Sequence, residues 1–122
     1  HHQFISIAKE AAEGIYMTFG FTDKNKPAYK KYLGAYSGEH GEPGAYSGYS
    51  YDGAMVLLTA IKNAKSTDPK KIKAEIMKMD MDGASKHIKF MENGDSGSDY
   101  IIYTIADGQF KNYWNPATGK LF

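Results

Sequence analysis

The chain has 122 residues, a formal net charge of +1 and no cysteine, and hydrophobic residues make up 42% of it. This length and composition predict one folded domain or part of one, and they exclude a disordered tail and a bundle of membrane-spanning helices. The lack of cysteine excludes disulfides, thiolate zinc sites and cysteine nucleophiles. The near-neutral charge, with lysine and no arginine, argues against a protein that binds nucleic acid.

The first third of the chain predicts a helix, a strand and a second helix. Residues 4–12 have apolar side chains at roughly helical spacing, and residues 15–19 are aromatic or β-branched enough for a strand. A helix should then begin at Pro27 and end near Gly38. Its apolar stripe consists of Tyr29, Tyr32, Leu33 and Tyr36.

Residues 34–51 contain five glycines and four tyrosines, and this composition predicts a long loop that leads into a helix. The helix itself is predicted at residues 51–64. Its buried stripe is expected to be Ala54, Leu57, Leu58 and Ile61. Asp52 lies near the start of this helix, where a carboxylate favours the helix dipole and caps backbone amides.

A fourth helix should begin at Thr67-Asp68-Pro69, because a capping residue is followed by proline. From about Gly83 the apolar period changes from 3.6 to 2, which predicts a β meander. Its strands are expected at residues 87–90, 100–105 and 110–114, with hairpin turns at Asn93-Gly94 and Asp107-Gly108. Gly83 is the only candidate boundary between two parts of the chain.

The sequence predicts no catalytic residue, no metal site and no cofactor. The four histidines do not form a His-x-x-His or His-x-x-x-His pair, and no glycine-rich phosphate loop or Gly-x-Ser-x-Gly motif occurs. Asp80-x-Asp82-Gly83 resembles the start of a calcium loop, but Met91 stands where the twelfth-position glutamate belongs. A small hydrolase is therefore the least favoured function.

Tyrosine is unusually frequent, at 10 residues. Tyr46, Tyr49 and Tyr51 cluster at the predicted start of the helix at residues 51–64. Such rings can form the wall of a small-molecule pocket, or they can pack a loop onto the core. The residues alone leave both interpretations open.

Four motifs, in order, resemble the periplasmic substrate-binding proteins that deliver branched-chain amino acids and related solutes to ABC importers. The central motif is Gly48–Ala64, in which Tyr51-Asp52-Gly53 opens a helix that ends in Ala60-Ile61-Lys62-Asn63-Ala64. The other three are Ala11–Tyr16, Ser66–Ile72 and the segment from Ile88 to Phe110. Together they cover nearly the whole chain.

The resemblance implies an α/β chain that forms the C-terminal part of a two-lobed fold, with helices followed by a terminal antiparallel meander. Residues 1–82 would correspond to the end of the first lobe and the hinge, and residues 83–122 to the end of the second lobe. Within these, Pro27–Met79 would belong to the first lobe and His87–Phe110 to the second.

The resemblance also implies a function without catalysis, namely binding of a branched-chain amino acid or a similar small solute for an ABC permease. Tyr46 falls near the aromatic residue that the family places against the ligand side chain, and Tyr49 is the second candidate. The groups that hold the ligand's carboxylate and amine would lie upstream of this chain. The protein would be exported to the periplasm or the cell exterior, with a signal peptide outside this chain.

A segment of this kind should leave apolar surface exposed, so we expect either a missing N-terminal portion or a homo-oligomer to cover it. The alternative function is therefore a self-associating structural or interaction module. The chain does not begin with methionine, which predicts processing or truncation. His1-His2 is either the end of a purification tag or a native pair exposed by a cut.

Overall fold

The computed structural model describes residues 2–122, apart from the side chain of His2. The expectation for the His1-His2 pair therefore lies outside the described residues. The chain forms two compact units. One comprises the residues up to Phe21 together with Ser98–Phe122, and the other comprises Thr22–Gly97.

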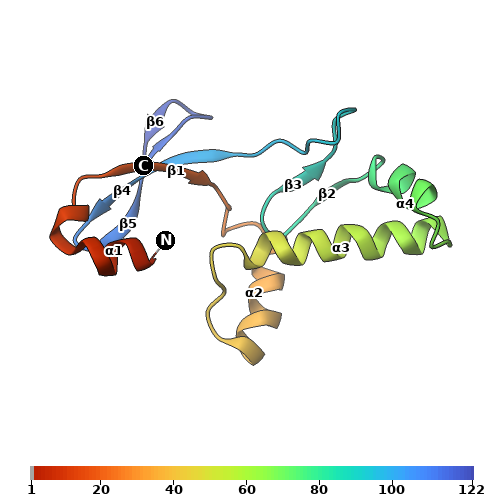
Figure 1. The fold of residues 1–122 in the computed structure, drawn as a ribbon, viewed down its shortest axis with the longest axis horizontal. Helices are drawn as coiled ribbons and strands as arrows, with labels where there is room; N and C mark the ends of the chain where they lie inside the picture. Colours follow the sequence, from red (N-terminus) through yellow and green to blue (C-terminus); the bar gives the residue numbers. More distant parts are fainter. Residues whose placement is uncertain (1) are drawn as a thin grey trace. The chain divides into compact units, whose positions relative to one another are not determined.

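The first unit is an antiparallel sheet with a short helical segment. The segment consists of α1 (His2–Ala8) and the 3-10 turn η1 (Lys9–Ala12). The sheet contains β1 (Tyr16–Gly20), β4 (Tyr100–Ala106), β5 (Gln109–Asn115) and β6 (Lys120–Leu121), in the order β1-β4-β5-β6 (Figure 1). Ala12, Ile101 and Ile105 are almost fully buried and form the centre of this unit. The predicted antiparallel pairing of residues 100–105 with 110–114 is thus confirmed by β4 and β5, whereas β6 was not predicted.

The turn between β4 and β5 is a tight hairpin, as Asp107-Gly108 predicts. Both residues have positive φ, 55° and 67°. The Glu13 carboxylate accepts hydrogen bonds from the backbone N–H groups of Asp107 (3.0 Å) and Gly108 (2.6 Å). The turn is therefore held both by its own backbone and by a side chain from the opposite end of the chain.

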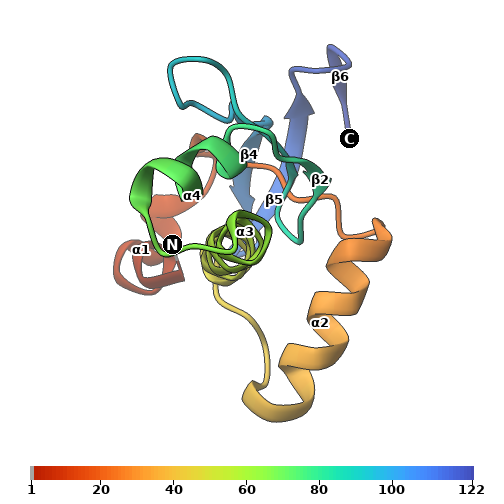
Figure 2. The same cartoon turned by 90° about the vertical axis from the view of Figure 1, so that its right-hand side faces the viewer.

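The second unit packs three helices with a small two-stranded sheet. The helices are α2 (Pro27–His40), α3 (Ser47–Ala64) and α4 (Pro69–Ile76), and the strands are β2 (Asp80–Asp82) and β3 (His87–Lys89). Figures 1 and 2 show β2 and β3 beside α3, with α4 at the C-terminal end of that helix. The core consists of Val56, Ala60, Met79 and Ile88.

The start of α4 matches the prediction. The Asp68 carboxylate accepts a hydrogen bond from the N–H of Lys70 at 2.9 Å, and Pro69 occupies the first helical position. No helix in residues 2–122 is long and apolar enough to cross a membrane.

The long loop expected at residues 34–51 is much shorter in the structure. Helix α2 continues through Gly34 and Gly38 to His40, and α3 already begins at Ser47. The connecting loop is therefore residues 41–46. A glycine inside a helix costs only about 1 kcal/mol relative to alanine, and the rings of Tyr29, Tyr32 and Tyr36 pack along this helix.

The exposed face of α3 is the one that the sequence predicted to be buried. Leu57 and Leu58 are 47% and 62% exposed, whereas Val56 and Ala60 on the opposite face are buried. Helix α3 is apolar on more than one side, so periodicity alone could not identify which face the core covers. We call Ala54, Leu57, Leu58 and Ile61 the α3 stripe.

The turn at Asn93-Gly94 forms, but it does not join two paired strands. Gly94 has a φ of 87°, and its N–H donates to the Met91 carbonyl at 2.8 Å. Strand β3 pairs with β2, whereas β4 pairs with β1 and β5. The predicted hairpin between residues 87–90 and 100–105 is therefore wrong, because the two strands belong to different sheets.

The candidate boundary at Gly83 falls between β2 and β3, which pair with each other inside one compact unit. His87 accordingly belongs to the same unit as α2, α3 and α4. The assignment of residues 1–82 and 83–122 to two lobes concerns a longer protein and stays a prediction.

Replacement of Gly108 by alanine tests the hairpin turn of the first unit. We expect a loss of about 1–2 kcal/mol in the free energy of unfolding, because an L-residue resists the left-handed conformation. The matched control is Gly34→Ala, since Gly34 has a helical conformation and no neighbouring atom within 4 Å of an added Cβ. The control should gain up to about 1 kcal/mol. Equal effects in urea denaturation would contradict this account of the turn.

Candidate functional site

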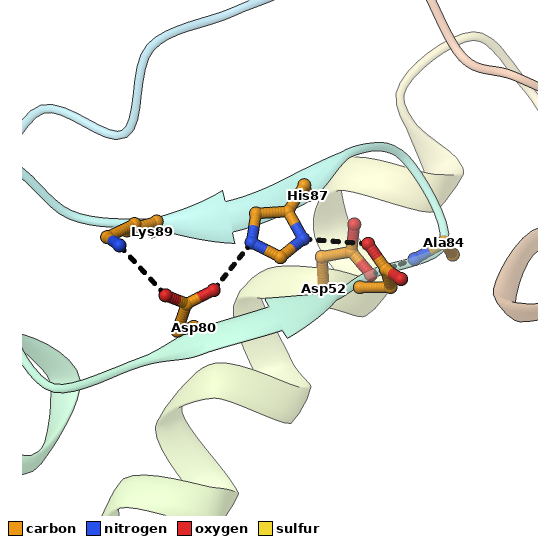
Figure 3. Close-up of polar contacts among 6 residues, drawn as sticks. Asp52, Asp80, Ala84, His87 and Lys89 are labelled. Atoms are coloured by element: carbon orange, nitrogen blue, oxygen red, sulfur yellow. Dashed lines mark hydrogen bonds and ion pairs between the residues drawn. The ribbon is translucent and has the colours of Figure 1, made fainter.

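The N-terminal half of α3 is fixed by one buried carboxylate. Asp52 is only 5% exposed. Its Oδ1 accepts a hydrogen bond from the Ala84 N–H at 2.6 Å (Figure 3). Its Oδ2 accepts from the Ser85 N–H at 2.8 Å and from the Ser85 hydroxyl. Three donors thus replace the water that this charge loses on burial. The contact joins α3 to the turn between β2 and β3.

The predicted role of Asp52 was local, and the structure corrects it. Tyr46 is the N-cap of α3 and makes no side-chain capping bond, and Asp52 lies in the second turn. Its carboxylate caps the backbone amides of a distant turn and not those of its own helix. The predicted cap of its own helix by Asp52 is therefore wrong, and the actual partners could not be identified from neighbouring sequence.

One glycine, Gly83, allows this close approach. A Cβ on Gly83 would lie 2.5–2.7 Å from the Asp52 carboxylate, which is closer than non-bonded atoms come. A Cβ on Gly48 would lie 3.6 Å from the Cβ of Ser85, an ordinary contact. The contact therefore requires glycine at position 83 but not at position 48.

A cluster of tyrosine rings joins α2 to the same end of α3. Tyr32 is buried, with its ring centroid 5.0 Å from that of Tyr51 and 5.5 Å from that of Tyr36. Tyr29 lies 6.1 Å from Tyr32, and His40 lies 5.1 Å from Tyr36. These rings position the start of α3 from one side, while Asp52 positions it through the β2–β3 turn.

The two predicted ligand-binding residues lie at this fixed end of α3. Tyr46 directly precedes the helix and is 61% exposed, and its carbonyl accepts the N–H of Ser50 at 3.0 Å. Tyr49 lies in the first turn of α3 and is partly buried. The structure thus brings both side chains to one helix end. Their contact with a ligand stays a prediction.

A charged group on β2 and β3 was not foreseen from the sequence. His87 Nδ1 lies 2.7 Å from Asp82 Oδ1, and His87 Nε2 lies 2.7 Å from Asp80 Oδ1. Lys89 Nζ lies 2.9 Å from the other oxygen of Asp80 (Figure 3). In the sequence, charged residues alternate with apolar ones in both strands. This alternation indicates a charged group only once the register of β2 with β3 is known.

The geometry favours a charged imidazole, since both ring nitrogens of His87 can donate only in the protonated form. Hydrogen bonds to Asp82 and Asp80 raise the pKa of His87 above its ordinary 6.5. Bonds from Lys89 and then His87 lower the pKa of Asp80. The bond from His87 lowers the pKa of Asp82.

This group is not arranged as a metal site, because the two carboxylates bind opposite nitrogens of the imidazole ring. Among residues 2–122, no three histidine, cysteine, aspartate or glutamate side chains are placed to hold a metal ion together. The charged group therefore contributes to the pairing of β2 with β3.

Comparison with known proteins identifies the family. The sequence model described as "Periplasmic binding protein" matches residues 2–109, and the chain belongs to this family. The family consists of non-catalytic solute-binding proteins that are exported to the periplasm. The resemblance seen in the sequence motifs is thus confirmed.

Two curated relatives come from Brucella abortus. They are named Leu/Ile/Val-binding protein homolog 1 and homolog 2, and they are 32% and 30% identical to the chain over 117 and 114 residues. Each match covers 92% of this chain and 31% of the relative. The chain therefore spans about a third of the length of the curated relatives that it matches.

Solved structures support the same fold class. A leucine-binding protein, LivK, from Thermotoga maritima is 34% identical, with a TM-score of 0.81 over 96% of this chain and 35% of that protein. LivJ from Streptococcus pneumoniae, solved with isoleucine, has a TM-score of 0.75 over 91% of this chain and 33% of that protein. At 22% identity LivJ shows the fold alone. The predicted class, part of a two-lobed α/β fold with a terminal meander, is confirmed.

The change Asp52→Asn tests the buried carboxylate. The amide NH₂ of asparagine would face a backbone N–H, so we expect a loss of about 3 kcal/mol in the free energy of unfolding. Asp68→Asn is the matched control, because asparagine caps helices as well as aspartate does, and its effect should stay below about 0.5 kcal/mol. Urea denaturation measures both. A small effect of Asp52→Asn would show that α3 does not depend on this contact.

The change His87→Gln tests the charged group through pH. Because the pKa of His87 is raised in the folded chain, its contribution is full below pH 6.5 and is lost as the pH rises through the folded value. The lowered pKa values of Asp80 and Asp82 make their contributions disappear as the pH falls below 3.8. Stabilisation should therefore be greatest between these limits.

The measurement is thermal stability of the original chain and of His87→Gln across pH 4 to 9. The original chain should lose stability above pH 6.5 relative to His87→Gln. His40→Gln is the control, since it leaves His87 and both its carboxylates in place and should keep this pH dependence. Parallel curves for the original chain and His87→Gln would overturn the assignment.

Proposed function

We propose that this chain is part of the solute-binding component of an ABC importer, and that the component binds a branched-chain amino acid or a similar small solute without chemistry. The observation that carries the proposal is the match to the Thermotoga leucine-binding protein, at 34% identity along 96% of this chain. The names of the two Brucella relatives point to the same ligand class. The component would act in the periplasm and deliver its solute to a membrane permease.

Tyr46 and Tyr49 are the ligand-contacting residues in this proposal. An aromatic ring gives a rigid apolar surface against which a branched aliphatic side chain can pack. The exposure of Tyr46 and the fixed position of α3 support this role, since a ligand wall must be both accessible and held in place. Groups elsewhere in the longer protein would bind the ligand's carboxylate and amine.

The exposed α3 stripe supports the presence of further chain in the functional protein. A longer chain of the same protein, about three times this length in the relatives, would cover the stripe and complete the two lobes. Closure of the lobes around the solute would then be the state that the permease recognises.

The alternative is self-association of this chain through the same stripe, and exposed Leu57 and Leu58 favour it. Native mass by light scattering, compared with the denatured mass of the same sample, separates the two. A native mass that is a multiple of the chain's 13.5 kDa, with no longer polypeptide present, would favour self-association.

Calorimetric titration of the full-length protein with L-leucine, L-isoleucine and L-valine tests the proposed ligand class. Tyr46→Ala should weaken binding about tenfold, which corresponds to roughly 1.4 kcal/mol, because the ligand loses a ring contact. Tyr100→Ala is the matched control, since Tyr100 is similarly exposed but lies in β4. Binding of none of the three amino acids would refute the ligand class, and equal effects of both variants would refute the role of Tyr46.

A further inference from the structure

The segment that follows β3 is a compact loop held largely by its own hydrogen bonds. The Met91 N–H donates to the Asp95 carbonyl at 2.7 Å, and the Asp95 N–H donates to Asn93 Oδ1 at 3.0 Å. The Gly97 N–H donates to Asp95 Oδ1 at 2.8 Å. Gly97, with a φ of 63°, ends this loop and is the last residue of the second unit.

Lys86 holds the end of this loop. Its Nζ donates to the Ser96 carbonyl at 2.6 Å, to the Ser96 hydroxyl at 3.1 Å and to the Gly97 carbonyl. An ammonium group has three donors, and all three are used here on neutral oxygens of two consecutive residues. Such an arrangement fixes the position of a backbone segment, in contrast to the surface ion pair of Lys89 with Asp80.

The residues that Lys86 holds lie where the chain leaves the second unit. The chain passes between the units twice, after Phe21 and after Gly97. In the first unit these two passages are joined, because the Phe21 N–H donates to the Asp99 carbonyl at 2.7 Å. Lys86 therefore binds the last two residues of the second unit, directly before one of the two connections.

Lys86 is also joined to the start of α3. Its carbonyl accepts the Gly83 N–H at 2.8 Å and so closes the turn between β2 and β3. The neighbouring residues, Ala84 and Ser85, are the ones that Asp52 binds. Asp52 thus binds the backbone of the turn on one side, and Lys86, in the same turn, binds Ser96 and Gly97 on the other.

We propose that Lys86 is a positioning residue that anchors the connection at Gly97 to the end of α3 that carries Tyr46 and Tyr49. Movement of one unit about the connections is then transmitted to that end of α3, and occupation of a ligand site there restrains the connection. The anchoring follows from the contacts of Lys86 alone. The link to ligand rests on the proposed function.

Hydrogen exchange of the full-length protein without ligand tests the anchor. Lys86→Met keeps the aliphatic stem and removes the three donors, so exchange of the hydrogen-bonded amides of this loop, those of Met91, Asp95 and Gly97, should become at least tenfold faster. Lys89→Met is the matched control, since it removes a lysine of β3 that contacts only the β2 side, and these amides should be unchanged. Equal exchange in the original protein and Lys86→Met would overturn the proposal.

A second variant covers the case in which Lys86→Met does not fold. Ser96→Ala removes one of the three acceptors and should accelerate exchange of the same amides, by a smaller factor. No acceleration in Ser96→Ala, with Lys86→Met unfolded, would show that Lys86 supports the fold and not the connection.

Stopped-flow kinetics with L-leucine separate anchoring from a merely structural role. Lys86→Met should increase the dissociation rate at least fivefold and leave the association rate nearly unchanged, because the ligand-bound arrangement loses its restraint. Lower thermal stability with unaltered dissociation would overturn the coupling. If the original protein does not bind leucine, the proposed ligand class fails, and the exchange experiment still decides the anchor.

Discussion

The buried carboxylate of Asp52 is the interaction on which the second unit depends. It accepts three hydrogen bonds from the turn between β2 and β3, and this turn needs Gly83 because no Cβ fits beside the carboxylate. Without this contact, only the small core around Val56, Ala60, Met79 and Ile88 would hold the two strands against α3. Together with the tyrosine cluster, it positions the end of α3 next to Tyr46.

Much of the fold follows from local sequence. Helices α2 and α4 and the β4–β5 hairpin were predicted because proline, capping aspartate and Asp-Gly act over a few residues. Helix α3 was predicted from its apolar periodicity. Strand β2 (Asp80–Asp82) was missed because its two aspartates were compared with the start of a calcium loop. The length of the predicted loop at residues 34–51 was overestimated because helix packing can accommodate glycine.

Less of the candidate site than of the fold could be predicted from the sequence. Tyr46 and Tyr49 were chosen by resemblance to a family, and the structure places them at a well-held helix end without testing their contact with ligand. The importance of Asp52 was partly visible, but its partners lie more than 30 positions away. The charged group of Asp80, Asp82 and His87 needs the register of two strands, and the role of Lys86 needs the path of a loop. Long-range pairing of this kind is not encoded in any local pattern.

The arrangement of the two units has a consequence for the order in which the chain can fold. The second unit is continuous in sequence, so it can form as soon as residues 22–97 are available. In the first unit β1 pairs with β4, and these strands come from opposite ends of the chain. Bringing them together carries a loop-closure cost that a folded second unit reduces by holding the intervening residues compact. We therefore infer that helices α2 to α4 fold early and that the four-stranded sheet closes last.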